Sequence, residues 1–471
     1  MAFNSLTFLI FLAIIFALYQ LPVSWAWRKV ILLLGSYLFY CAWNPPFVSL
    51  ILISTVVDWV AAKRIFVSVG RRKFIWLLIT LSVNLGLLGY FKYGTFLIDN
   101  FQSLLAIVGI NYEPAPFSII LPMGISFYTF QTLSYSIDIY RGKAKPSRSF
   151  LDYALFVTFF PQLVAGPIVR AVDFIPQCYR SKHPTSSQLG WGLILLTIGL
   201  FQKIVLADSL FAPMADRVYA EPEIASVAAA WMGTLAFSGQ ILFDFAGYST
   251  CAIGIALCLG FALPDNFRYP YAAIGFSDFW QRWHISLSSW LRDYLYFPLG
   301  GNRSGEWLRA RNVMLTMLIG GLWHGASWTF VVWGGMHGSY LVAEQLFRQK
   351  LGHLEFWNQP FARFFLAVCT YLLITLTWVF FRAQDFTSAS HIISAMFGGG
   401  VASWGAEGLR GPVVVLVMCL VLIHQWFMRE TNLEVFFGQL PHSVIAIGIS
   451  GAIIIMLLVE GDNHGFIYFQ F

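Results

Sequence analysis

Long apolar runs, bounded by aromatic, basic or proline-containing segments, recur from the first residues of the chain to the last. A transmembrane helix needs about 20 predominantly apolar residues, so the pattern predicts an all-α, polytopic integral membrane protein with about 11 or 12 spans. Residues 224–263 are predicted to hold one long span plus a re-entrant or half helix. The other predicted spans are 6–24, 30–43, 46–62, 74–91, 117–139, 187–207, 311–329, 330–347, 361–381, 409–428 and 441–459.

Three segments depart from this simple pattern. Residues 150–170 are apolar but contain Pro161 and the pair Gly166-Pro167. This favours a broken segment that enters and leaves on one face, with a kinked ordinary span as the alternative. Residues 95–110 are predicted to rest near the outer surface. Residues 278–297 separate aromatic from polar side chains at helical periodicity, which predicts a re-entrant or interfacial amphipathic helix lying flat, aromatic side down.

The distribution of charge predicts the orientation in the membrane. The loop from Lys63 to Lys73 carries five basic residues and no acid, and a second basic loop spans residues 141–148. Both are expected in the cytoplasm, which places the N-terminus outside. Residues 187–207 then lead outward to an acidic stretch that begins at Asp208. We predict one membrane domain over 1–471, with a motif core at about 117–383, N-terminal helices in 1–110 and C-terminal helices in 384–471.

Composition agrees with this class. The 471 residues are 58% hydrophobic and 11% charged, against about 25% charged in soluble domains, which leaves no room for a sizeable soluble domain. The net charge of +6 lies in a few loops and indicates membrane topology, not nucleic-acid binding. The six cysteines form no C-x-x-C pair, so neither a metal site nor a disulfide framework is expected. Residues 1–23 lack a basic signal-peptide region and are predicted to be a retained span.

Candidate chemistry centres on the run GGLWHGASW at 320–328. If helical, the run places Gly320, His324, Ser327 and Trp328 on one face, and Gly321 with Gly325 would let another helix approach closely. A polar side chain at membrane depth needs a partner or a wet cavity. A buried neutral imidazole can take a proton from a hydroxyl, although a packing histidine is the plainer alternative for His324.

Other polar groups are weaker candidates. His284 lies in the amphipathic segment, and the other seven histidines, including His337, are predicted to be structural or solvated. Asp244 in GQILFDFAGYST is predicted to be a carboxylate inside the membrane. A functional role and a purely structural role, with the carboxylate satisfied by neighbouring polar groups, are equally compatible with its position. The sequence contains no G-x-S-x-G elbow, H-E-x-x-H motif or phosphate-cradling glycine loop. The residues therefore favour an enzyme that transfers a chemical group. The alternatives are a proton-coupled transporter that uses His324 and Asp244 as a relay, and a scaffold without catalytic activity.

Seven stretches together resemble the membrane-bound O-acyltransferase family, most of all its bacterial alginate O-acetyltransferase branch. The resemblance runs in consistent order over most of the chain. The stretches are LPMGISFYTFQTLSYSIDIYRGK (121–143), FFPQLVAGPIVR (159–170), FDFAGYS (243–249), NFRYPY (266–271), FWQRWHISLSSWLRDYLYFPLGGNR (279–303), LWHGASWTFVVWGGMHG (322–338) and TWVFFRA (377–383).

The resemblance implies roles for individual residues. The family's essential histidine in its W-H-G motif falls on His324. The family's second functional position, a histidine or asparagine in a polar helix, falls on His284. The helix motif around His284 is matched by Trp283, Arg292, Asp293 and Tyr294, and the broken segment by Gln162, Gly166, Pro167 and Arg170. Where relatives commonly continue the F-D-F motif with an aspartate, this chain has Thr250, which leaves Asp244 as the acid there.

Together these features predict an O-acetyltransferase of the bacterial inner membrane that holds no bound cofactor and no metal. Acetyl-CoA, or another thioester, would enter from the cytoplasmic face, where Arg282, Arg292, Arg303 and the Arg170 loop could attract its phosphates. His324 would act as base, with Trp323 and Trp328 shaping a dry funnel. The acceptor would be a periplasmic serine-type (SGNH) acetyltransferase, or an exported polysaccharide such as alginate or cellulose directly.

Overall fold

A computed structural model describes residues 1–114, 119–303, 305–400, 410–459 and 465–467. The described residues form helices and loops and contain no strand, so the predicted all-α class is confirmed. Residues 117, 118 and 409, which begin or fall in two predicted spans, lie outside this described part. The chain divides into two compact units, residues 1–193 with 252–264 and residues 194–251 with 265–471. Each is treated separately below.

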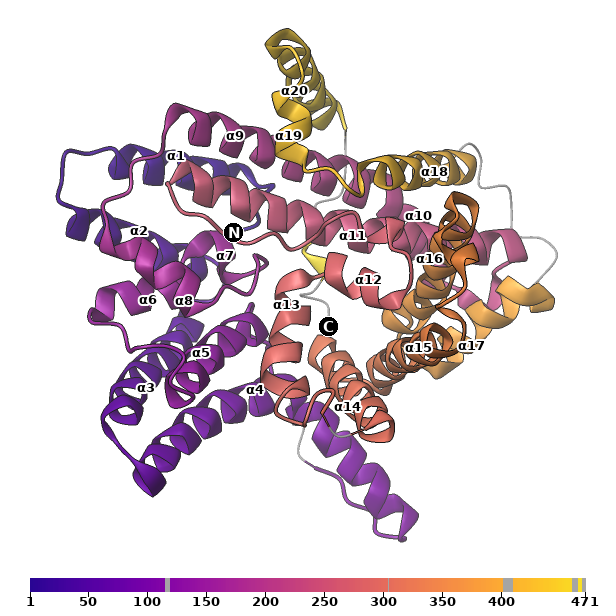
Figure 1. Cartoon of the computed structure of the whole chain (residues 1–471), viewed down its shortest axis with the longest axis horizontal. Coiled ribbons are helices and arrows are strands. Elements are labelled where there is room, and N and C mark those ends of the chain that lie inside the picture. The colour runs from indigo at the N-terminus through magenta and orange to yellow at the C-terminus, as the bar shows by residue number, and fades with distance from the viewer. Residues whose placement is uncertain (115–118, 304, 401–409, 460–464, 468–471) are drawn as a thin grey trace. The chain divides into compact units, whose positions relative to one another are not determined.

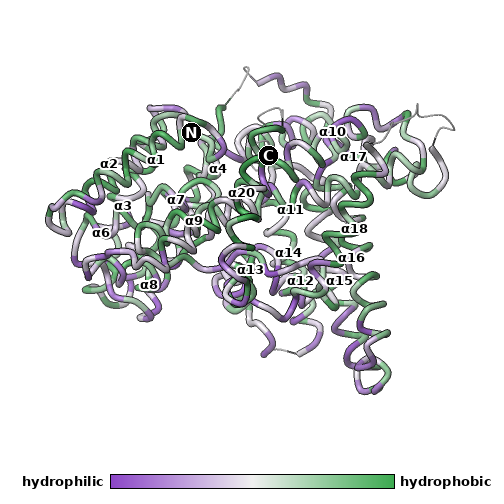
Figure 2. The backbone as a smooth tube through the Cα atoms, turned by 90° about the horizontal axis from the view of Figure 1, so that it is seen from above, coloured by the Kyte–Doolittle hydropathy of each residue, from purple (hydrophilic) through white to green (hydrophobic). Residues whose placement is uncertain are grey.

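Within the described ranges, five helical stretches are long and apolar enough to cross a membrane: Gly70–Ile107, Ser186–Ala220, Val227–Cys258, Pro360–Arg382 and Gly411–Met428. Two shorter apolar helices are Leu6–Tyr19 and His442–Leu458. Figure 2 shows hydrophobic residues concentrated along the helices and hydrophilic residues at helix ends and connections. The chain is a multi-pass membrane protein, and the larger predicted number of spans stays a prediction.

The first unit is built from α1 to α8. Helices α3, α4 and α5 pack on one another, and α2 packs on α6 (Figure 1). The bounds are α1 Leu6–Tyr19, α2 Trp25–Cys41, η1 Pro45–Phe47, α3 Val48–Val67, α4 Gly70–Ile107, α5 Ile125–Tyr140, α6 Phe150–Thr158, α7 Phe160–Leu163, α8 Ala171–Phe174 and η2 Ile175–Tyr179. Helix α4 is continuous through most of residues 95–110, and the position of these residues near the outer surface stays a prediction.

A polar cluster lies between α3, α4 and α5. The Asp58 carboxylate is fully buried and accepts hydrogen bonds from the Asn84 amide, at 2.9 and 3.0 Å, and from the Thr80 hydroxyl. The Ser54 hydroxyl donates to the Asn84 side-chain oxygen at 2.6 Å. An ionisable group in an apolar helix is costly unless satisfied in this way, so the cluster ties the three helices together.

The predicted break in residues 150–170 is confirmed. Helix α6 ends at Thr158, the short α7 follows, and the chain from Val164 to Arg170 is not helical. The Phe160 backbone N–H, which would be left over at this break, donates to the Ser36 hydroxyl at 3.0 Å. Unwound backbone inside an apolar protein is stable only when its polar groups are paired like this.

The second unit contains most of the remaining helices. Their bounds are α9 Ser186–Phe201, η3 Gln202–Phe211, α10 Ala212–Ala220, η4 Pro222–Ile224, α11 Val227–Cys258, η5 Pro270–Ala272, α12 Phe276–Arg282, α13 Ile285–Leu291, η6 Arg292–Tyr296, α14 Glu306–His324, α15 Trp328–Leu351, η7 Glu355–Asn358, α16 Pro360–Arg382, α17 Phe386–Ser394, η8 Ala395–Gly399, α18 Arg410–Met428, α19 Leu433–Gly438 and α20 His442–Leu458. The first residues of α9 and the last of α11 belong to the first unit.

Two predictions for this unit are wrong. Residues 224–263 hold one 32-residue helix, α11, instead of a span plus a half helix. The amphipathic segment 278–297 is not one flat helix, because it breaks at Trp283 and His284 into α12 and α13 and continues as the π-helix η6. Trp283 and His284 are fully buried, so the aromatic side of this segment packs into the unit at the break.

Helices α14 and α15 lie side by side and pack extensively against each other (Figure 1). Gly321 faces the Phe330 backbone carbonyl, and Gly334 faces that of Met317, so closely that an added Cβ would overlap either oxygen. The predicted approach of another helix at Gly321 is therefore confirmed, and α15 is that helix. The contact holds the end of α14, and with it His324, in a defined position.

Candidate active site

Two histidines lie together in the core of the second unit. The ring centroids of His284 and His324 are 6.2 Å apart, and the two residues are 0% and 2% exposed. The pairing brings together the two candidates from separate motifs, one before α13 and the other at the end of α14. Such a buried pair of imidazoles can bind and release protons away from bulk water.

His324 is the last residue of α14. Gly325 follows in an extended conformation, and α15 begins at Trp328. The run 320–328 is therefore a helix–turn–helix junction, and the prediction that Ser327 and Trp328 share a helical face with His324 is wrong. The Ser327 hydroxyl caps α15 by accepting from the Thr329 backbone N–H at 3.3 Å, while Trp328 is 53% exposed and does not enclose His324.

His284 occupies an unusual backbone conformation. Its φ of 42° is left-handed, which is rare for a residue with a Cβ and costs about 1–3 kcal/mol. Asn266 compensates: its backbone carbonyl accepts from the Ile285 N–H at 2.9 Å, and its side-chain oxygen accepts from the Ser286 hydroxyl at 2.8 Å. The Asn266 amide in turn donates to the Ser249 hydroxyl at 3.1 Å. The NFRYPY and FDFAGYS motifs thus fix the turn that presents His284.

Aromatic rings surround both imidazoles. Trp323, Trp333 and Phe381 pack around His324 with centroid distances of 5.1, 5.0 and 5.4 Å. Phe245 meets the His284 ring edge-to-face at 4.5 Å, and Trp323 lies 5.9 Å from it. Trp323 is 3% exposed, so its predicted place beside His324 agrees with the structure. Such walls exclude water and strengthen electrostatic interactions inside them.

Burial determines the charge of His284, which lies between α12 and α13 and outside the membrane-crossing helices. Burial lowers the pKa of His284 to about 3, so the ring is neutral at physiological pH. A neutral imidazole has one nitrogen lone pair available to accept a proton. The nearby His337 is also fully buried, on α15, and its Nε2 lies 3.1 Å from the Thr377 hydroxyl, which agrees with the structural role predicted for it.

Three predicted residues from the α13 motif form a separate group in η6. The Arg292 Nε lies 2.9 Å from the Asp293 carboxylate, and the Tyr294 ring packs on Trp290 at 5.0 Å. Arg292 is exposed and Asp293 and Tyr294 are partly exposed, unlike the buried histidines. The structure therefore places them in a more accessible environment than the imidazole pair.

Asp244 forms part of a buried ion cluster. The Lys203 Nζ lies 2.5 Å from the Asp244 carboxylate and 2.7 Å from that of Asp208, and all three side chains are at most 6% exposed. The Ile467 backbone N–H donates to Asp244 at 2.6 Å. These contacts support the structural role considered for Asp244. The prediction that Asp208 begins an acidic stretch outside the membrane is wrong, because Asp208 is buried with Lys203.

The local helix type explains this cluster. Residues 202–211 form a π-helix, in which hydrogen bonds join residues five apart. Lys203 and Asp208 have that spacing, so their side chains meet on one face. Lys203 and, in the first unit, Asp58 were not among the residues predicted from the sequence. The available signal was the same for both: one charged residue inside an otherwise apolar run.

The predicted residues of the broken segment lie in the first unit. Gln162 on α7 is fully buried, and its amide donates to the Phe156 backbone carbonyl at 2.7 Å. Arg170 is the residue immediately before α8 and is partly exposed.

Among the predicted donor-binding cations, Arg282 in the second unit is already paired with Asp278 at 2.7 Å, so its charge is largely compensated within the protein.

Comparison with known proteins agrees with these features. The model of the membrane-bound O-acyltransferase family matches residues 144–381. The chain is 41% identical to a probable alginate O-acetylase, AlgI, of Azotobacter vinelandii, over 93% of this chain and 86% of the relative. It is 39% identical to the corresponding Pseudomonas aeruginosa protein (93% and 83%) and 38% identical to a peptidoglycan O-acetyltransferase of Helicobacter pylori (79% and 74%).

The chain belongs to the membrane-bound O-acyltransferase family. It is therefore an acyltransferase of the membrane, and the reading of the chain as a transporter or a silent scaffold loses its support. Both histidines lie within the matched residues, as do Asp244, Gln162 and Arg170.

Proposed function

We propose that this protein transfers acetyl groups from a cytoplasmic thioester, acetyl-CoA, to an exported polysaccharide, either directly or through a serine-type acetyltransferase in the periplasm. The names of its relatives support O-acetylation of a cell-surface or exported glycan: alginate for those of Azotobacter and Pseudomonas, peptidoglycan for that of Helicobacter. The observation that carries the proposal is the buried pair of imidazoles, His284 and His324. Two basic stretches, at 63–73 and 141–148, support a cytoplasmic donor side and an N-terminus outside a bacterial inner membrane.

The proposed chemistry needs only one base. His324 accepts the proton of the acceptor hydroxyl as the hydroxyl oxygen forms a bond to the thioester carbonyl carbon. The carbon–sulfur bond then breaks, and the thiolate takes up the proton from the His324 imidazolium. The products are an acetyl ester and a free thiol, and His324 is neutral again. His284 is positioned to support this exchange, and the aromatic walls keep water from hydrolysing the thioester.

Substitution of His324 by glutamine tests the base assignment. Glutamine keeps a polar side chain of similar size but cannot act as a base near neutral pH, so acetyl transfer should fall by about 10²–10⁴-fold. The measurement is radiolabel passing from acetyl-CoA to polymer in membranes that hold equal amounts of inserted protein. His337→Gln is the matched control, since its amide can still pair with Thr377, and it should keep wild-type activity. Normal transfer by the His324 variant would refute the assignment.

A further inference from the structure

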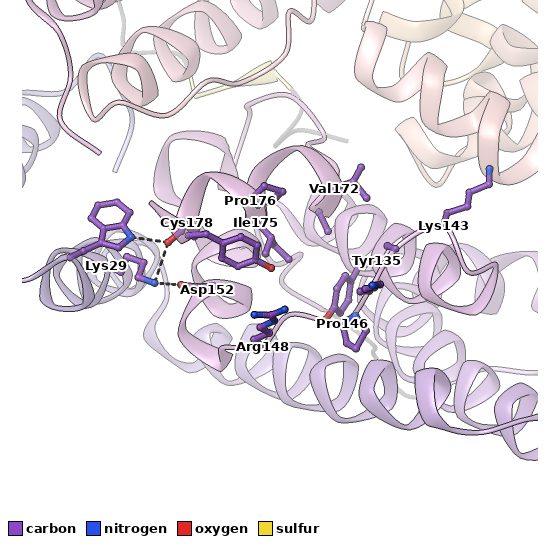
Figure 3. Close-up of a pocket in the computed structure, with 15 residues that line it drawn as sticks. Lys29, Tyr135, Lys143, Pro146, Arg148, Asp152, Val172, Ile175, Pro176 and Cys178 are labelled. Carbon is purple, nitrogen blue, oxygen red and sulfur yellow. Dashed lines mark hydrogen bonds and ion pairs between the residues drawn. The ribbon is translucent and has the colours of Figure 1, made fainter. Parts of the chain in front are cut away.

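A cavity of about 750 Å³ lies in the first unit, remote in sequence from the histidine motifs (Figure 3). It is open on one side and is lined by the start of α2, the loop that follows α5, the start of α6, and the α8–η2 segment. Its volume falls in the range of roughly 300–1,000 Å³ that is typical of small-molecule sites. Neither His284 nor His324 lines this cavity.

The charge of the cavity is strongly unbalanced. Of the cations that line it, Lys29 is paired with Asp152, the single acid of the lining. Lys143, Lys145 and Arg148 are exposed, and within the described ranges no acidic side chain pairs with any of the three. Lys145 and Arg148 therefore place two uncompensated positive charges on one opening, where they attract an anion of high charge density, whereas the Lys143 side chain extends away from it (Figure 3).

The loop that carries these cations is held in place. After α5, Gly142 adopts a left-handed φ of 72°, and the Lys143 N–H donates to the Asp138 backbone carbonyl at 2.8 Å. Further along, Ser147 is 1% exposed and its backbone N–H donates to the Tyr135 hydroxyl at 2.9 Å. A loop fixed at both ends presents its charges without a large ordering cost on binding.

The opposite wall suits binding and not covalent chemistry. The Trp25 indole N–H donates to the Cys178 backbone carbonyl at 2.7 Å, which Lys29 also contacts at 3.4 Å (Figure 3). Burial, and then the Asp152 carboxylate, raise the pKa of the Cys178 thiol to about 12, so the thiol is protonated and a poor acyl acceptor. Tyr179, 56% exposed at the rim, offers a ring face for stacking.

We propose that this cavity is a binding site for a phosphate-bearing anion on the predicted cytoplasmic face. Two sources share that chemistry: a nucleotide with several phosphates, such as the one in coenzyme A, and the headgroup of an anionic phospholipid. Lys145 and Arg148 bind the phosphate oxygens, and the aromatic residues of the lining contact the less polar part of the ligand.

The first test uses adenosine 3′,5′-bisphosphate and protein in nanodiscs of phosphatidylcholine. Lys145→Gln/Arg148→Gln removes two cavity charges, while Arg71→Gln/Arg72→Gln removes two from the exposed first turn of α4 and serves as the matched control. If the nucleotide is the ligand, calorimetry shows saturable binding that weakens at least tenfold in the first variant only. All four positions are exposed, so both variants should keep wild-type thermal stability.

The second test uses native mass spectrometry of protein reconstituted with mixed phosphatidylglycerol and phosphatidylcholine. If the lipid is the ligand, wild type and the Arg71/Arg72 variant retain phosphatidylglycerol preferentially, and the cavity variant loses that preference. The proposal is overturned if wild type binds neither probe, or if the cavity variant binds as well as wild type. The His324→Gln variant should bind like wild type, so this outcome is independent of the base assignment.

Discussion

Replacing Lys203 by methionine removes the cation that two buried carboxylates, Asp208 and Asp244, both contact. Methionine preserves most of the side-chain volume, so the change tests charge and not packing. Removing one partner of a buried ion pair costs about 3–5 kcal/mol, because the remaining charge is desolvated and uncompensated. With about 1.4 kcal/mol for each factor of ten, the folded-to-unfolded ratio should fall by roughly two to three and a half orders of magnitude.

The assay is reversible unfolding of purified protein by SDS in mixed micelles, followed by tryptophan fluorescence. Arg382→Met is the matched control, since Arg382 and Asp216 are also 2.7 Å apart but their side chains are 19% and 38% exposed. That variant should lose only about 0–1 kcal/mol. Adding Asp208→Asn and Asp244→Asn to Lys203→Met should recover most of the lost stability. If Lys203→Met costs no more than Arg382→Met, the reasoning about this cluster is wrong.

Three further perturbations test the histidine site. Asn266→Leu removes the side-chain oxygen that the Ser286 hydroxyl contacts; acetyl transfer should fall at least tenfold while purified protein stays monodisperse on gel filtration. Gly321→Ala forces a methyl group onto the Phe330 carbonyl and should lower the unfolding midpoint by several degrees, whereas Gly86→Ala, which meets no atom, should not. Because burial lowers the pKa of His284 to about 3, the unfolded chain binds more protons than the folded one between pH 3 and 6.5. Stability should then drop by about 2 kcal/mol from pH 7 to pH 5, and His284→Gln should lack that part of the drop.

The sequence was sufficient for the class of fold and for the central pair of residues. Apolar periodicity predicted helices, and a histidine in a Trp-His-Gly run with no nearby charge identified His324 as a residue that needs a partner. The break at His284 was not predicted, because the amphipathic pattern resumes after it and only Ile285 departs from that pattern. Asn266, a residue from an earlier motif, stabilises the left-handed turn, and local periodicity carries no information about such a partner.

The ion cluster escaped prediction for a related reason. Asp208 follows an apolar run and precedes further acids, so its neighbours in sequence suggest a solvated loop. Its real environment is set by a π-helix that turns Lys203 toward it and by Asp244 on another helix. Neither the helix type nor the partner is encoded in hydrophobic periodicity. The cationic cavity likewise depends on four segments that meet only in the folded unit.

The position of His324 at the end of α14 has an electrostatic consequence. The peptide dipoles of a helix add up to roughly half a negative elementary charge at its carboxyl end, where the final carbonyl groups have no amide above them. An imidazole that gains a proton there becomes a cation next to that partial charge, which favours the ion by about 0.3–1 kcal/mol. A ring in the middle of the same helix would lack this contribution. The junction at Gly325 therefore supplies part of the counter-charge that a short-lived imidazolium requires, in a pocket otherwise lined by aromatic rings.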